Sequence, residues 1–267
     1  MHRPVPVLAL LAVLAGCKQV EPAPKELDAL LHWMWQRYED GTDDALAEGA
    51  ANLWDAVDGA GLDDHVDGSV TPLTAEEVAL VGVTDRDPAD APGVFLVNAY
   101  TCTLEQLEPI LLHAAQDELY EGVYDRYDRS YTTSREAFEA REISTMAWEV
   151  SYEASLFGTA YSAVIEGGLR AIPDVEAARH GAFLMGRTHL PEPAEFEGDS
   201  RSQSQDYQLE IWQSRDDGSL LHIYGLWREA DFGSGITSAD EGSQRLLLNN
   251  LRQWDDETEA HCAAGRP

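Results

Sequence analysis

Carboxylate side chains and a histidine stand close together in the segment Asp63 to Gly68, whose sequence is DDHVDG. Asp63, His65, Asp67 and Gly68 match the first, third, fifth and sixth positions of a calcium-binding loop, which supply oxygen ligands and a turning glycine. The twelfth position requires a glutamate that holds the ion with both oxygens, and here it is Thr74. We therefore interpret the segment as a polar turn and predict no metal site.

The other residues that could do acid, base or nucleophilic chemistry are scattered. The sequence contains no HExxH, GxSxG or GxGxxG motif, and no two histidines have a spacing suited to a transition metal. Four single histidines fit hydrogen-bonded or exposed imidazoles better than a catalytic centre: His113, His180, His189 and His222. A hydrolase is the second alternative, because the many Asp and Glu residues could form a carboxylate pair on folding. The sequence favours a protein that is not an enzyme, and it predicts no cofactor.

Acidic residues dominate the charge, since 49 Asp and Glu stand against 18 Lys and Arg and give a formal net charge of −31. A field of this sign repels nucleic acids and anionic lipid headgroups, so we expect no nucleic acid as a partner. Lys18 and Lys25 are the only lysines, and both precede the first expected helix. The rest of the chain therefore lacks the ε-amino group needed for a Schiff base or a Walker A phosphate site.

An apolar run, Val5 to Gly16, ends at Cys17. The run is shorter than the roughly 20 residues that a helix needs to cross a bilayer. It follows His2 and Arg3, which gives the layout of a secretory signal. The end of the run matches the Leu-Ala-Gly-Cys box of bacterial lipoprotein precursors, and the first twenty or so residues resemble that family: Leu14, Ala15, Gly16 and Cys17.

This resemblance implies that residues 1–16 are a signal peptide that is removed, and that Cys17 carries acyl chains such as palmitate. Two or more chains would anchor the protein stably in a membrane. Residues 17–26 contain Pro22 and Pro24 and read as a spacer between the lipid and the folded part. Lys18, where an aspartate often retains family members at the inner membrane, favours the outer membrane of the bacterial cell envelope. The alternative is an ordinary secretory signal with an incidental cysteine.

Residues 27–83 show the periodicity of helices. Apolar residues recur at helical spacing from Leu27 to Tyr38 and again from Leu46 to Val57. Thr74 and Glu77 have the spacing of a capping box and predict a short helix through Val81. The charged, proline-containing segment 84–93 is the best candidate for a boundary with the rest of the chain.

Residues 94–262 are expected to form an antiparallel sheet with helices. A strand at 94–102 precedes a helix over 103–119, with a kink expected at Pro109. Alternating residues around Trp148 and Tyr161 predict two strands joined at Gly158, and Asp216-Asp217-Gly218 predicts a hairpin between 207–214 and 220–228. An apolar stripe between 238 and 261 predicts a closing helix. The fold class is therefore α+β, with N-terminal helices, an antiparallel sheet and a C-terminal helix.

This order of elements resembles the helix-grip fold of START-like lipid-binding domains. The resemblance covers about residues 94–262 and implies that an apolar small molecule binds between the sheet and the closing helix. Six strand residues would then be candidates to line the cavity, although residues of these types more often belong to an ordinary core: Trp148, Tyr152, Tyr161, Ile211, Ile223 and Trp227. The alternative function is a surface lipoprotein without a pocket that binds another envelope protein.

Two cysteines remain after Cys17, and the expected compartment permits disulfide bonds. Cys102 and Cys262 could pair, or each could remain a thiol, Cys102 buried at the end of a strand. The sequence leaves both alternatives open.

Overall fold

A computed structural model describes residues 22–58, 66–156, 158–175, 181–198 and 200–265. The predicted signal peptide, Cys17 and the start of the spacer lie outside these residues, as do Asp63, His65 and His180. None of the described helices is both long and apolar enough to cross a membrane.

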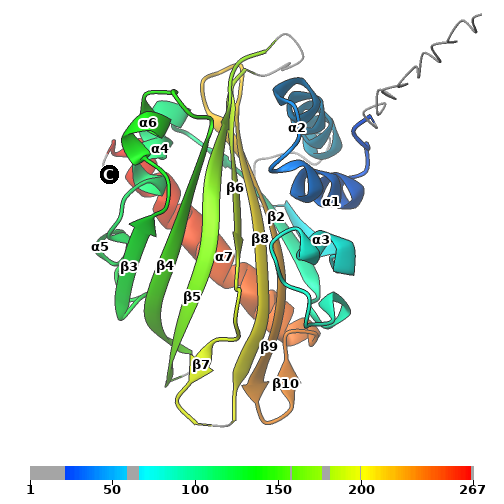
Figure 1. The fold of residues 1–267 in the computed structure, drawn as a ribbon, viewed down its shortest axis with the longest axis vertical. Coiled ribbons are helices and arrows are strands. Elements are labelled where there is room, and N and C mark those ends of the chain that lie inside the picture. Colours follow the sequence, from blue (N-terminus) through cyan, green and yellow to red (C-terminus); the bar gives the residue numbers. More distant parts are fainter. Residues whose placement is uncertain (1–21, 59–65, 157, 176–180, 199, 266–267) are drawn as a thin grey trace, which may run out of the picture.

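A large antiparallel sheet forms the centre of the molecule (Figure 1). Its strand order is β1-β2-β9-β8-β6-β5-β4-β3, with β10 paired to β9 and β7 paired to β5. The strands are β1 (Val66–Val70), β2 (Gly93–Tyr100), β3 (Arg126–Tyr131), β4 (Thr145–Leu156), β5 (Thr159–Ile172), β6 (Phe183–His189), β7 (Glu195–Phe196), β8 (Ser202–Ser214), β9 (Leu220–Gly233) and β10 (Ile236–Thr237).

Three helices cover one face of the sheet: α1 (Leu27–Arg37), α2 (Asp43–Asp58) and α3 (Ala75–Ala79). The predicted capping box is present, because Thr74 accepts from the Glu77 backbone while the Glu77 carboxylate accepts from the Thr74 backbone N–H at 2.6 Å. The same buried carboxylate accepts from His32 Nδ1 at 2.9 Å and from Gln36 Nε2 at 2.8 Å. The cap of α3 therefore also holds α1 in place.

The opposite face carries α4 (Leu104–Leu111), α5 (Gln116–Leu119), α6 (Arg135–Glu139) and α7 (Glu241–Ala263). The prediction of one helix over 103–119 was wrong. The capping box of Thr103 and Gln106 starts α4, but α4 ends before Leu112 instead of kinking at Pro109. Gln116 Nε2 donates to the carbonyls of Ile110 and His113, which closes the turn between α4 and α5.

Apolar side chains fill the space on both faces of the sheet. One core lies under α1–α3 and includes Trp35, Tyr207 and Trp227, and the other lies on the α7 side and includes Trp148 and Trp212. Strand β1 and the core residue Leu73 come from residues 27–83, which were predicted mainly as helices, and β1 pairs with β2 beyond the predicted boundary. Residues 27–83 thus share the sheet and one core with the chain after residue 93.

The α+β class with an antiparallel sheet and a closing C-terminal helix is confirmed. Residues 66–68, the described end of the segment predicted as a polar turn, belong to strand β1, where Asp67 forms an ion pair with Arg252 of α7. Cys102 and Cys262 form a disulfide bond with Cα atoms 5.8 Å apart, which joins the end of α7 to the link between β2 and α4. The paired alternative is therefore the one that the structure contains.

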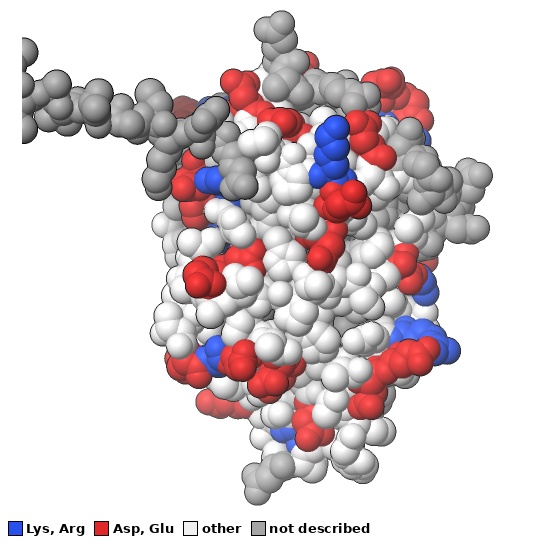
Figure 2. Space-filling model, turned by 90° about the vertical axis from the view of Figure 1, so that its right-hand side faces the viewer, with Lys and Arg blue, Asp and Glu red and all other residues white. Residues whose placement is uncertain are grey.

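The acidic side chains are spread over the surface. On the face that includes helices α1–α3, they lie in several groups separated by uncharged surface (Figure 2). No single acidic patch dominates this view, which fits a solvated surface better than one docking site for a basic partner.

Candidate functional site

The six residues predicted to line a ligand cavity lie on two different faces of the sheet. Trp148 and Tyr152 belong to the α7 side, and Tyr161 contacts Tyr152 with ring centroids 5.9 Å apart. Ile211, Ile223 and Trp227 are part of the core under α1–α3. Successive side chains of a strand point to opposite faces, so these two groups of three cannot line one cavity.

A chamber lies on the α7 side of the sheet, where the helix-grip resemblance places a ligand. Its volume is about 110 Å³, below the roughly 150 Å³ of an engineered cavity that binds benzene. The gap between the sheet and α7 is thus largely filled by side chains. The chamber is lined by Leu111, Gln116, Tyr124, Tyr127, Arg129, Trp148, Ile165, Leu169, Gly186, Thr188, Gln208, Glu210, Trp212 and Trp254.

Aromatic rings form much of the wall. The rings of Tyr124 and Tyr127 lie 4.9 Å apart, and Tyr124 also contacts Tyr152 at 5.6 Å in an edge-to-face arrangement. Arg129 covers the ring of Trp148 at 4.7 Å, and its Nη1 donates to the Leu111 carbonyl at 2.5 Å. Such rings offer flat apolar contact to a small ligand while the guanidinium stays hydrogen-bonded.

Apart from Glu210 Oε2, which faces His222, two buried polar atoms of lining residues have no hydrogen-bond partner among the residues that the structure describes. They are the hydroxyl Oγ1 of Thr188 and the indole Nε1 of Trp212, and Trp212 is only 2% exposed. A buried polar group without a partner costs free energy, typically about 1–3 kcal/mol. A ligand atom that accepts from the indole N–H or bonds to the hydroxyl would remove this cost.

A buried ionic chain stands behind the chamber. His222 Nε2 lies 3.2 Å from Glu210 Oε2, and His222 Nδ1 lies 2.6 Å from Asp255 Oδ1, which also accepts from the Tyr100 hydroxyl. Burial by itself lowers the pKa of His222, but the carboxylates of Asp255 and Glu210 raise it to about 9. The ring is therefore protonated at neutral pH and stacks on Trp212 at 5.0 Å.

Glu210 connects this chain to the chamber, because it lines the cavity and faces His222 at the same time. Burial raises the pKa of the Glu210 carboxyl, while the neighbouring imidazolium acts in the opposite direction. A carboxyl group in this position can hydrogen-bond a ligand hydroxyl or amine. Within the described residues, no group of three or more His, Cys, Asp or Glu side chains could hold a metal ion.

No protein-family model and no curated protein matches the sequence. Solved structures are similar at low identity. A START superfamily protein from Mycobacterium smegmatis matches with a TM-score of 0.41 at 10% identity, covering 64% of this chain and 97% of that one. Human StAR-related lipid transfer protein 5 matches with a TM-score of 0.36 at 6% identity, covering 81% of this chain and 93% of that one.

A protein from Thermus thermophilus gives a TM-score of 0.37 at 13% identity, covering 66% of this chain and 100% of that one. Two of these three structures are named as a START superfamily protein and a StAR-related lipid transfer protein.

The polar groups of the chamber belong to three residues that were not predicted from the sequence: Thr188, Glu210 and Trp212. The alternation in the predicted strand 207–214 does place Glu210 and Trp212 on one face and Ile211 on the other. That pattern was present in the sequence, but nothing in it told which face would meet the closing helix.

Proposed function

We propose that this domain binds a small, mainly apolar ligand with one polar group in the chamber under α7. The observation that carries the proposal is a pair of buried atoms in the chamber lining, Thr188 Oγ1 and Trp212 Nε1. Neither has a hydrogen-bond partner among the described residues, and aromatic rings form part of the same wall. The rings supply apolar contact, and the two atoms with Glu210 supply hydrogen bonds that fix the ligand's orientation.

The size of the chamber restricts the ligand. A volume of about 110 Å³ limits the ligand to a single small ring that fits tightly, whereas drug-sized ligands occupy pockets of about 300–1,000 Å³. A long acyl chain would require α7 to move, and the disulfide at Cys262 and the ion pair at Asp255 both oppose that motion. We therefore narrow the expected apolar ligand to a compact compound such as a phenol.

Phenol binding tests this function, with tryptophan fluorescence and calorimetry as the two measurements. Ile165→Phe places a ring in the chamber and is expected to abolish binding. Val164→Phe is the matched control, because Val164 is the adjacent residue, is 41% exposed and does not line the chamber. Thr188→Val removes the unpartnered hydroxyl and is expected to weaken the binding of phenol more than the binding of benzene. Equal binding by the Ile165→Phe and Val164→Phe variants would refute the proposal.

We further propose that the protein acts as a lipoprotein of the cell envelope, anchored through acyl chains on Cys17. The support is the Leu-Ala-Gly-Cys box and the proline-containing spacer that follows it. Labelling of growing cells with a palmitate analogue is expected to mark the protein and to leave a Cys17→Ser variant unmarked. An N-terminal peptide that still begins at Met1 would argue against this localisation.

A further inference from the structure

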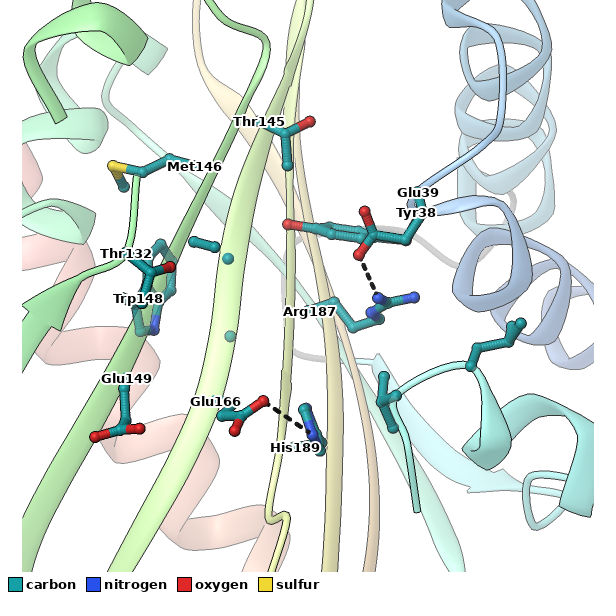
Figure 3. A pocket seen from close by; sticks show the side chains of 15 residues that line it. Tyr38, Glu39, Thr132, Thr145, Met146, Trp148, Glu149, Glu166, Arg187 and His189 are labelled. Atoms are coloured by element: carbon teal, nitrogen blue, oxygen red, sulfur yellow. Dashed lines mark hydrogen bonds and ion pairs between the residues drawn. The ribbon is translucent and has the colours of Figure 1, made fainter. Parts of the chain in front are cut away.

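A second pocket lies on the other face of the sheet, at the end of α1 (Figure 3). Its volume is about 460 Å³, and it is bounded by the end of α1, the turn after α3 and strands β4, β5 and β6. Its charged and polar lining includes Tyr38, Glu39, Glu149, Glu166, Arg187 and His189. We call it the outer pocket, and it is separate from the chamber under α7.

At one end of the outer pocket, two hydrogen-bond acceptors face each other. His189 Nε2 lies 3.8 Å from Glu166 Oε2, too far for a hydrogen bond, and has no other partner among the described residues. A hydrogen bond to the backbone of Val81 also involves the imidazole. Since Nε2 has no partner among the described residues, we assign this bond and the ring proton to Nδ1, which leaves Nε2 as an acceptor. Burial, together with Arg187 and Arg86, lowers the pKa of His189 to about 4, so the ring is neutral at pH 7.

The positive charge in the outer pocket is already neutralised within the protein. Arg187 Nη2 donates to Glu39 at 2.6 Å, and its guanidinium lies 4.4 Å from the centre of the Tyr38 ring. The described lining of the pocket contains no second arginine or lysine to balance Glu149 and Glu166, so the lining carries an excess of negative charge. A cationic ligand is therefore favoured over an anionic one.

The other end of the outer pocket offers a hydrogen-bond donor. The Tyr38 hydroxyl is buried and has no partner in the part of the chain that the structure describes. It lies against Gly168, where a Cβ atom would come within 2.9 Å of the hydroxyl oxygen. Gly168 pairs with Arg187, and Glu166 pairs with His189. The Tyr38 end and the His189 end of the pocket are therefore two residues apart along the strands, which corresponds to about 7 Å.

We propose that the outer pocket binds a small primary amine, with its ammonium group held between His189 Nε2 and the Glu166 carboxylate. An ammonium group has three N–H donors and can satisfy both acceptors at once. A hydroxyl or carbonyl oxygen about 7 Å away in the ligand would accept from Tyr38. This inference does not depend on the ligand of the chamber.

The test uses 6-amino-1-hexanol as the probe, titrated by calorimetry into the full chain at about 0.15 M salt, where long-range attraction is screened. The control probe is its N-trimethyl analogue, which has the same charge but no N–H donor. We expect saturable binding of the amine and binding at least about tenfold weaker for the analogue. Equal binding of both cations, or no binding of the amine, would overturn the proposal.

Glu166→Gln is expected to lower the affinity for the amine at least about tenfold. The Glu166 side chain is 53% exposed, so the variant should fold. The matched control is Glu121→Gln, an equal change of charge at an exposed residue outside the pocket. An unchanged affinity in Glu166→Gln, or an equal loss in Glu121→Gln, would refute the site. The Ile165→Phe variant of the chamber is expected to bind the amine normally, which separates this inference from the proposed function.

Discussion

His222 Nδ1 lies 2.6 Å from Asp255 Oδ1 and thereby joins the first part of strand β9 to the closing helix α7. Both side chains are at most 2% exposed. Asp255 follows Trp254, which lines the chamber, so the ion pair fixes one wall of the candidate site as well as the helix. A buried pair of this kind is costly to break, because the remaining charge loses its partner without regaining water.

Asp255→Asn is expected to lower the free energy of unfolding by about 3 kcal/mol, because it removes the nearer of the two carboxylates that balance the charge of buried His222. Urea denaturation monitored by circular dichroism measures the change. Glu48→Gln is the control, since Glu48 is an exposed helical carboxylate, and a change within about 0.5 kcal/mol is expected there. If both variants lost similar stability, the prediction that the His222–Asp255 ion pair stabilises the fold would be contradicted.

The stability of the protein is expected to fall as the pH rises from 6.5 to 9. The pKa of His222 is raised to about 9 in the folded state, above the ordinary 6.5, so its stabilising effect is complete below pH 6.5 and lost as pH passes 9. Linkage limits this loss to about 3 kcal/mol. Urea midpoints across this range measure it.

His222→Gln should show a flatter stability profile over the same range, because the titrating group is gone. The imidazole resonances of His222 provide a direct check in the unchanged protein. A midpoint of titration near 6.5 would contradict the assigned ionic chain.

Reduction of the disulfide is expected to destabilise the fold by up to about 5 kcal/mol. The bond closes a loop with a sequence separation of 160, and the entropy that it removes from the unfolded chain grows with loop length. Urea midpoints with and without a reductant measure the effect. The control is the double variant Cys102→Ala, Cys262→Ala, whose urea midpoint the reductant should not change. If the reduced protein had the same urea midpoint as the oxidised protein, the prediction would be contradicted.

Glu77→Gln should weaken the attachment of α1 to α3 by about 2 kcal/mol, because one carboxylate serves three donors there. Although burial opposes ionisation, the hydrogen bonds from His32, Thr74 and Gln36 lower the pKa of Glu77 to about 2. Its contribution is therefore present above pH 4.5 and lost as the pH falls toward 2. Between pH 4.5 and pH 2, the Glu77→Gln variant should therefore lose less stability than the unchanged protein. Acid titration of both proteins, monitored by circular dichroism, measures the difference.

The local elements were predictable where one feature of the sequence decides them. The stripe from Leu27 to Tyr38 and the box of Thr74 and Glu77 predicted helices α1 and α3, and Asp216-Asp217-Gly218 lies in the turn of the β8–β9 hairpin. The break after α4 was not predictable from Pro109, because it depends on the hydrogen bonds of Gln116.

The sequence determined the α+β class, because periodicity and turn residues act within a few residues of one another. It could not determine the faces of the sheet. Helices cover both faces, so the run Leu220–Trp227 is buried throughout, and apolar character no longer marks one side. Only the packing of α7 and α1–α3 decided that Trp212 and Glu210 meet a chamber while Ile211 and Trp227 become core, because these contacts join residues far apart in the chain.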